Sequence, residues 1–556
     1  MKLPNKVYPY LLFWIVLNLI QAFFSELIHD EAYYWFYSTK LDWGYFDHPP
    51  AIAFFIKIGY AIFENELGVR LAIVLMSTAT LWLIWKTING NNPALFFALV
   101  FSTAIIHVGG FIAVPDIPLV FFTAFYFYFF KKYLEKDSWL NALIISFAVI
   151  GMAYSKYQGA LVVIFSILPN LKLLKRPSLW LIPVLTLLAY IPHFNWQVVH
   201  EFPTFRYQFL DRSNVPYKIE FFFNYILGQL LIFGPLIGLI LFPAAVKYKT
   251  GNDFEKTMKW CFYGFFGFFL LQSTRGRIEP NWTVMAAIPM FYFGYHYLIN
   301  HEKLKTRALK LLVPSFMLIM IFRIYMMVDL LPEGLVKRDE FHGWKNWATM
   351  ISEKAGDLPV VFHNTFQKPS KYMFYTGKFA HSANAVNYAG KEYDLRVDLE
   401  EKIQGKTVFE IHDQGKDTLD TGSTGILNYD ITPDYRYYNR VKLRIPQQTY
   451  EVPLDTVLEI PIKMENPTDK DIDFSVHPPG EVSIEYCLFW YGVPKHCQPA
   501  TESFPVKKIK AGESIDLKAK IKTPPEDGDH WRFRLAIKTK GFYGRNSNST
   551  LYKIID

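Results

Sequence analysis

Residues 8–28 read YPYLLFWIVLNLIQAFFSELI, an apolar run with one charged residue, Glu26. A helix needs roughly 20 mostly apolar residues to cross the hydrocarbon core of a bilayer, so this run predicts a transmembrane helix. Similar runs follow, at residues 67–88, 93–111, 115–131, 138–155, 158–174, 178–196, 221–246, 258–273, 282–299 and 308–330. We therefore predict a polytopic α-helical membrane protein with about eleven transmembrane helices.

The overall composition averages two different parts of the chain. Of the 556 residues, 51% are hydrophobic and 19% are charged, but the apolar runs end near residue 330. Beyond that point, short alternating segments such as 457–462 and 531–537 are separated by turn residues, which is typical of a β-sandwich. We predict a transmembrane domain at 1–330, a soluble mixed α/β subdomain at 331–424 and a soluble β-sandwich-like subdomain at 425–556.

The net charge of +8 is explained by the predicted membrane topology, because of where the basic residues lie along the chain. Basic residues collect in alternate short loops between apolar runs, for example Lys131, Lys132 and Lys136. Since cytoplasmic loops carry an excess of Lys and Arg, the pattern predicts a multi-pass plasma (inner) membrane protein with its C-terminal domain on the extracytoplasmic side. A nucleic-acid binder would gather its charge on one face, so we expect membrane lipids and no nucleic acid as partners.

The first extracytoplasmic loop, residues 29–66, is too long to be a simple connector. It is dense in aromatic residues, including Tyr33–Tyr37 and Trp43. Such side chains settle at membrane–water boundaries, which predicts a segment lying in the interface. Residues 50–63 predict a short helix that cannot span the membrane. In the C-terminal part, Cys487 and Cys497 could form a disulfide in an extracytoplasmic domain or remain two buried thiols.

Three acidic elements lie at this outer boundary. Asp30-Glu31 directly follows the first apolar run, Asp47-His48-Pro49-Pro50 follows in the same loop, and Asp116-Ile117-Pro118-Leu119 opens the fourth run. A single acid at such a place most often ends a helix and is solvated. Acids near the membrane interior are costly, however, and those that remain there tend to be functional. Their occurrence together on one side, beside prolines and an aromatic loop, favours a functional site.

In this order and spacing, the three elements resemble those of the GT-C fold glycosyltransferases that use lipid-linked sugars. The similar branch is that of the protein O-mannosyltransferases and aminoarabinose transferases, glycosyltransferase family 39. The resemblance covers roughly residues 8–330. Where the family commonly has Lys, this chain has His48, which is charged only when protonated. His48 is therefore either a contact for the donor phosphate or a hydrogen-bonded turn residue.

The resemblance implies an inverting glycosyltransferase that moves a sugar from a polyprenyl-phosphate donor to a protein, lipid A or envelope-glycan acceptor. It implies Asp30 as the general base and Asp116 as a second acid that orients the acceptor or Asp30. Glu31 and Asp47 are candidates for positioning or for a metal, and a divalent cation (Mg²⁺ or Mn²⁺) is possible, although no spacing demands it. The leaving phosphate needs positive charge; the candidates are Arg275 and Arg277 first, then Arg206 and Arg212, with Lys156 and His48.

Two other functions are compatible with the same sequence. A multi-pass transporter or flippase of lipid-linked substrates would also have many helices, but it usually places polar residues near the bilayer midplane in repeated halves. A non-catalytic envelope-assembly protein would bind through the C-terminal sandwich and would not depend on Asp30.

Overall fold

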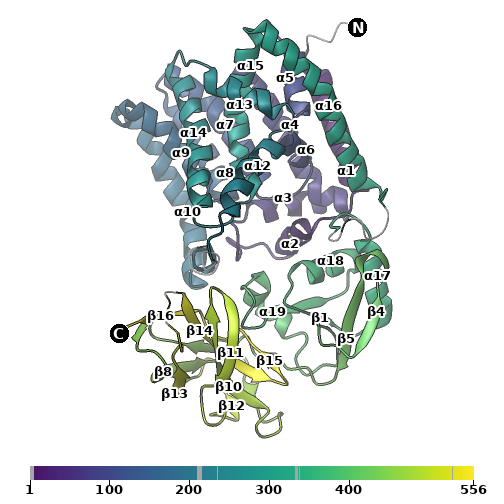
Figure 1. The fold of residues 1–556 in the computed structure, drawn as a ribbon, viewed down its shortest axis with the longest axis vertical. Helices are drawn as coiled ribbons and strands as arrows, with labels where there is room; N and C mark the ends of the chain where they lie inside the picture. Colours follow the sequence, from purple (N-terminus) through teal and green to yellow (C-terminus); the bar gives the residue numbers. More distant parts are fainter. Residues whose placement is uncertain are drawn as a thin grey trace. The chain divides into compact units, whose positions relative to one another are not determined.

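The computed structural model describes residues 6–555, except 209–215, 235, 332–335, 337, 338, 527 and 529. By its internal contacts, the chain separates into two compact units. The first comprises Met1–Glu201 and Tyr217–Trp344, and the second comprises Phe202–Pro216 and Lys345–Asp556. Figure 1 shows that the first unit is helical and the second is built mainly of strands.

The first unit contains α1 (Tyr8–Phe24), α2 (His29–Ser38), α3 (Ala51–Tyr60), α4 (Glu66–Ile88), α5 (Pro93–Phe101), α6 (Ala104–Val108), α7 (Asp116–Glu135), α8 (Trp139–Ser155), α9 (Gly159–Ile167), α10 (Leu181–Val199), α12 (Glu220–Ile232), α13 (Gly238–Lys247), α14 (Asp253–Ser273), α15 (Ala287–Ile299) and α16 (Glu302–Met327). The 3₁₀ segments η1 (Leu168–Lys175), η2 (Pro177–Trp180) and η4 (Pro280–Ala286) connect them. The buried side of α7 packs against α4 and α8 at the centre of the apolar core. Large apolar side chains such as Leu187 and Ile191 on α10 face outward.

Within the described residues, three helices are long and apolar enough to cross a membrane: α4, η2 with α10, and α16. A fourth is added if α1 and α2, which meet at 89°, count as one bent span. The predicted spans 93–111 and 221–246 are each interrupted in the structure, the first between α5 and α6 and the second between α12 and α13. The hydroxyls of Ser102 and Thr103 donate to carbonyls at the first break. At the second, Gly234 has a φ of +115°, which only glycine adopts easily.

All five aromatic side chains of Tyr33–Tyr37 are buried within the protein, so they pack against protein groups. After the sharp turn that follows α1, α2 packs against α3. The ring of Tyr37 stacks on Tyr45 with centroids 4.2 Å apart, and the Tyr45 hydroxyl donates to the carbonyls of Tyr37 and Lys40. The aromatic residues of the first loop thus make a packed support for the acids on either side of them.

The second unit begins with a five-stranded sheet in the order β2-β1-β3-β5-β4. Its strands are β1 (Val360–His363), β2 (Ala380–Ala383), β3 (Val408–Ile411), β4 (Asp417–Asp420) and β5 (Ile426–Thr432), with helices α17 (Trp344–Ala355), α18 (Gln367–Thr376) and α19 (Val397–Glu400) between or before them. The first three strands are parallel, whereas β5 and β4 are antiparallel to their neighbours. The short helix α11 (Pro203–Arg206) also belongs to this unit.

A β-rich part follows, with its own hydrophobic core. One sheet has the order β11-β10-β14-β16-β7, another has β13-β8-β6, and β12 pairs with β9. The strands are β6 (Lys442–Arg444), β7 (Thr449–Val452), β8 (Val457–Glu465), β9 (Ile472–Asp473), β10 (Val482–Trp490), β11 (Val493–Pro499), β12 (Lys508–Ile509), β13 (Ser514–Lys522), β14 (Trp531–Thr539), β15 (Phe542–Tyr543) and β16 (Thr550–Ile554). Cys487 and Cys497, opposite each other on β10 and β11, form a disulfide.

Candidate active site

The Asp30-Glu31 pair opens α2, just after the chain turns away from α1. Both acids lie in the first helical turn, where the unpaired backbone N–H groups favour negative charge. Their environments differ sharply, because the Asp30 side chain is exposed and the Glu31 side chain is fully buried. Two adjacent carboxylates are therefore suited to different tasks.

Glu31 is held by a clamp of charge-assisted hydrogen bonds. Arg70, buried on α4, donates from Nε to Oε1 at 2.7 Å and from Nη2 to Oε2 at 2.5 Å. The backbone N–H groups of Ala113 and Ile28 donate to the same carboxylate at 2.8 and 3.1 Å. A bidentate guanidinium–carboxylate pair fixes orientation as well as distance. Because Ala113 lies three residues before Asp116, this clamp joins the start of α2 to the segment that leads into α7.

Asp116 is the first residue of α7 and forms a buried ion pair. Lys156, immediately after the last residue of α8, places its Nζ 2.9 and 3.0 Å from the two carboxylate oxygens of Asp116. Both side chains are only 7% exposed. Because α7 and α8 are consecutive packed helices, the start of one meets the end of the other. Lys156, predicted to bind the donor phosphate, is therefore engaged with the second predicted acid.

A chain of hydrogen bonds connects this region with the first loop. The Tyr157 hydroxyl, next to Lys156, lies 3.0 Å from Nε2 of His193 on α10, and His193 Nδ1 lies 2.7 Å from the carbonyl of Trp43. Since a carbonyl only accepts, Nδ1 carries the proton and Nε2 accepts from Tyr157. Gln197 donates to the Tyr157 hydroxyl at 3.1 Å. The loop that carries Asp47 is thus anchored to the residue beside Lys156.

We expect His193→Phe to lower any reaction at this site about tenfold. The ring volume stays, but the partly buried Trp43 carbonyl and Tyr157 hydroxyl each lose their hydrogen bond to His193, at about 0.5–1.5 kcal/mol for each bond. Initial rates of the purified variant measure the effect. Tyr190→Phe is the control, because it removes one long hydrogen bond, to the Ala153 carbonyl at 3.4 Å, from the same cluster of rings. Equal rates for both variants would show that the anchor does not matter.

Asp47 and His48 form a turn that precedes α3. The N–H of Tyr45 donates to the carbonyl of His48 at 3.1 Å, and both Asp47 and His48 are partly exposed. The His48 ring contacts Tyr34 edge to face, with centroids 5.6 Å apart. Tyr34 lies four residues after Asp30, so the two share a face of α2. The turn therefore lies on the same side of α2 as Asp30.

The predicted phosphate clamp has a more open environment. Arg275 and Arg277 are exposed in the segment after α14, and Arg277 pairs with Glu279, with its Nε at 3.1 Å from the carboxylate. Arg206 is partly buried in α11, which belongs to the second unit. Arg212 lies outside the described residues.

Two buried arginines could not be recognised as functional from the sequence, because each lies within an apolar run. Arg70 lies in the predicted span 67–88, and Arg323 lies in 308–330. Arg323 donates to Gln21 and Asn18 at 3.0 Å each and lies 3.1 Å from Nδ1 of His107, which ties α16 to α1 and α6. The available signal was the charge itself, since an arginine within an apolar run is costly and marks a buried partner.

Among the described residues, one group brings metal-type ligand atoms within 4.8 Å of one another: Asp329, Asp339 and His342. It follows α16 and includes none of the predicted acids. Asp339 already accepts hydrogen bonds from Tyr325, His342 and the N–H of Phe341. Burial alone would raise the pKa of Asp339, but these donors hold the pKa below its usual value. The carboxylate oxygens of Asp339 are thus satisfied by donors of the protein itself.

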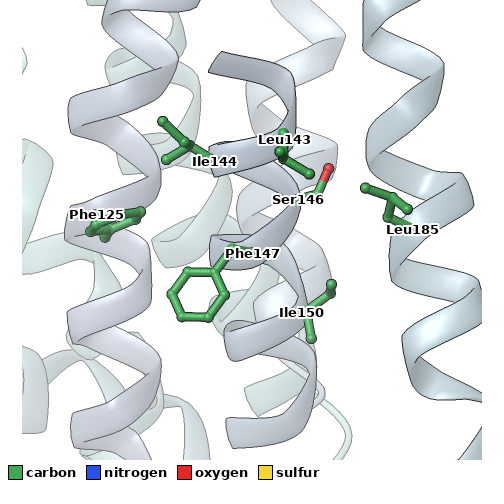
Figure 2. A pocket seen from close by; sticks show the side chains of 7 residues that line it. All are labelled: Phe125, Leu143, Ile144, Ser146, Phe147, Ile150 and Leu185. Atoms are coloured by element: carbon green, nitrogen blue, oxygen red, sulfur yellow. The ribbon is translucent and has the colours of Figure 1, made fainter. Parts of the chain in front are cut away.

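An apolar groove runs along α8, between α7 and α10 (Figure 2). Its volume is about 400 Å³. The lining side chains are Phe125, Leu143, Ile144, Ser146, Phe147, Ile150 and Leu185. At about 1.5 Å per residue, Ile150 lies roughly 9 Å and Leu143 roughly 20 Å along the helix from Lys156. The groove therefore extends away from the Asp116–Lys156 pair along the helix axis.

Comparisons with known proteins point to one class. Residues 47–196 match the family described as dolichyl-phosphate-mannose-protein mannosyltransferase. The lipid A galacturonosyltransferase RgtD of Rhizobium johnstonii is 25% identical over 293 residues, which cover 48% of this chain and 59% of that protein. The match thus spans about three fifths of the curated relative.

A solved structure matches a larger part of the chain. The crystal structure of ArnT from Cupriavidus metallidurans, bound to undecaprenyl phosphate, aligns with a TM-score of 0.56 and 15% identity. The alignment covers 76% of this chain and 97% of that chain. At this identity the likeness establishes the fold, and it confirms the GT-C resemblance that the three acidic elements predict.

Proposed function

We propose that this chain, a membrane protein with the GT-C fold of lipid-linked sugar transferases, is an inverting glycosyltransferase that uses a polyprenyl-phosphate sugar. The observation that carries the proposal is the Glu31–Arg70 clamp. It fixes the exposed Asp30 at the start of α2 and, through Ala113, the segment that leads to the Asp116–Lys156 pair. A transferase needs such a rigid arrangement of one accessible base and a second, oriented acid.

Each acid then has a separate role. Asp30, which is exposed, takes the proton of the acceptor hydroxyl as that oxygen attacks the anomeric carbon. Asp116, held by Lys156, orients the acceptor or the Asp30 carboxylate. Both oxygens of Glu31 accept hydrogen bonds from protein groups, so it is a positioning residue. Asp47 and His48 face the donor from the turn beside Tyr34.

The donor has two chemically different ends. As the sugar leaves, negative charge develops on the lipid phosphate, and cationic groups stabilise it. The candidates are His48, Lys156, Arg206, Arg212, Arg275 and Arg277. The groove along α8 offers an apolar surface of the kind that a polyprenyl tail requires, and it begins at Ile150, about 9 Å along the helix from Lys156. The presence of undecaprenyl phosphate in the ArnT structure supports a donor of this class.

The membrane topology and the acceptor of this chain are part of the proposed function. We place about eleven spans in the plasma (inner) membrane, with the site and the C-terminal unit on the extracytoplasmic side. The basic loops support this orientation. The acceptor is a lipid A or envelope glycan, or a protein; the name of the relative RgtD supports lipid A. A divalent cation, Mg²⁺ or Mn²⁺, would bind through carboxylate oxygens.

The decisive experiment supplies the purified full chain with a panel of polyprenyl-phosphate sugars and candidate acceptors. We expect one donor to yield a glycosylated product with inverted anomeric configuration, detected by mass spectrometry and NMR. A transporter would instead move the lipid-linked sugar across proteoliposomes without forming a product. Flux without transfer, for every donor, would refute the proposal.

A further inference from the structure

The turn between β10 and β11 carries a bulky aromatic residue where small residues are usual. Tyr491 and Gly492 form the two-residue connection, with φ values of +49° and +74°. Positive φ at both positions is the pattern of a type I′ turn, which favours Asn, Asp and Gly. A tyrosine in this conformation is strained, and strain at a bulky residue suggests that its side chain has a use.

The rings at this turn form two stacks. Trp490 lies parallel to Trp531, with centroids 5.6 Å apart and an interplanar angle of 11°. Tyr491 lies on His530 at 3.9 Å. Lys495 places its Nζ 5.2 Å from the centre of the Trp490 ring. Trp531 is buried, whereas Trp490, Tyr491 and His530 are only partly buried. The stacks therefore continue from the sandwich core to its surface.

We infer that this aromatic tip, formed by Trp490, Tyr491, His530 and Lys495, binds a saccharide chain. The C–H faces of a pyranose ring carry partial positive charge, and aromatic faces carry the negative part of a quadrupole, so the two attract each other. The ammonium group of Lys495 can donate hydrogen bonds to sugar hydroxyls and more strongly to a sugar carboxylate. The chemical class expected is therefore a glycan, preferably an anionic one.

A membrane surface is the other ligand that aromatic rings commonly meet. The surroundings disfavour it, because Lys495, His496 and Glu526 are exposed in the strand and the loop beside the rings. Carrying these side chains into hydrocarbon would be costly. Binding of a saccharide does not depend on the transfer reaction. That the saccharide is the glycan part of the acceptor rests on the proposed function.

Calorimetric titration of the full chain in detergent tests the inference. The probes are maltoheptaose and an oligogalacturonate of the same ring number, which differ in carboxylates. We expect saturable binding that weakens at least tenfold in Tyr491→Asn, without a fall in melting temperature, because Asn suits the turn. Lys495→Gln is expected to weaken only the anionic probe. If the Tyr491 ring had a merely structural role, Tyr491→Asn would lower the melting temperature and leave the saccharide affinity unchanged.

The chain offers a matched control. Lys540 and Gly541, between β14 and β15, have φ values of +45° and +85° and form the same kind of turn without an aromatic ring. Lys540→Asn should leave saccharide affinity unchanged. The inference is overturned if the wild-type chain binds neither probe, or if Tyr491→Asn binds both as well as the wild type does.

One further measurement distinguishes a glycan ligand of the aromatic tip from a membrane surface. A fluorophore on Tyr491→Cys in proteoliposomes should not be quenched by nitroxide-bearing lipids; strong quenching would assign the tip to the membrane surface and overturn the inference. Absence of sugar transfer by a chain that still binds saccharide would count against the proposed function alone.

Discussion

Replacing Asp30 with Asn is expected to lower sugar transfer by about 10²–10⁴-fold, the usual contribution of a positioned general base. The amide keeps the size of the side chain and its place in the first turn of α2, but it cannot take the proton of the acceptor hydroxyl. Donor affinity should change little, because the phosphate is bound by other groups. The measurement is the single-turnover rate with saturating donor, together with the donor Kd.

Asp42→Asn provides the control for this prediction. Asp42 is an exposed acid in the same loop, and its carboxylate accepts a hydrogen bond from the neighbouring N–H of Trp43 at 2.7 Å. An amide oxygen can accept the same bond, so transfer should stay near the wild-type rate. If Asp30→Asn transfers sugar as fast as Asp42→Asn, Asp30 is not the base.

Arg70→Met is expected to destabilise the helical unit by about 3–5 kcal/mol, because it leaves the Glu31 carboxylate charged and buried without its partner. Glu31 is fully buried, so water cannot replace the guanidinium. The effect is measured by thermal unfolding in detergent, with the loss of the helical circular dichroism signal as the readout.

The double variant Arg70→Met/Glu31→Gln separates the charge from the packing. Removing both charges should recover most of the stability, whereas transfer should stay low because the bidentate clamp that positions Asp30 is gone. Arg277→Met is the surface control: its ion pair with Glu279 is largely exposed, with side chains 74% and 36% accessible, and such pairs contribute at most about 1 kcal/mol. If Arg70→Met is as stable as Arg277→Met, the clamp does not support the fold.

The helical class of the first unit and the sites of its acids could be predicted from the order of residues. Apolar runs of membrane length indicate helices, whatever their neighbours are. The three acidic elements lie at helix starts or in the turn before a helix, where proline and acid are favoured. The alternation of side chains likewise predicted β8 and β14, since a period of two is a local property.

The breaks in the helices could not be predicted in the same way. Hydropathy sums the side chains of a run, whereas the ends of α5 and α12 depend on where backbone groups find other partners. Ser102, for example, donates to the carbonyl of Leu312 on α16, a contact that no window of sequence contains. The burial of the aromatic residues of α2 could not be predicted for a related reason, because their composition suits a membrane interface and a protein interior equally well.

By itself, the sequence determined which acids stand at helix starts and that most of the first unit is helical, because these depend on neighbours along the chain. Only the tertiary structure decided which acid is accessible and which is neutralised. Glu31 is paired with Arg70, 39 residues away, and Asp116 with Lys156, 40 residues away. Charge acts through distance in space, and that distance exists only after the helices have packed.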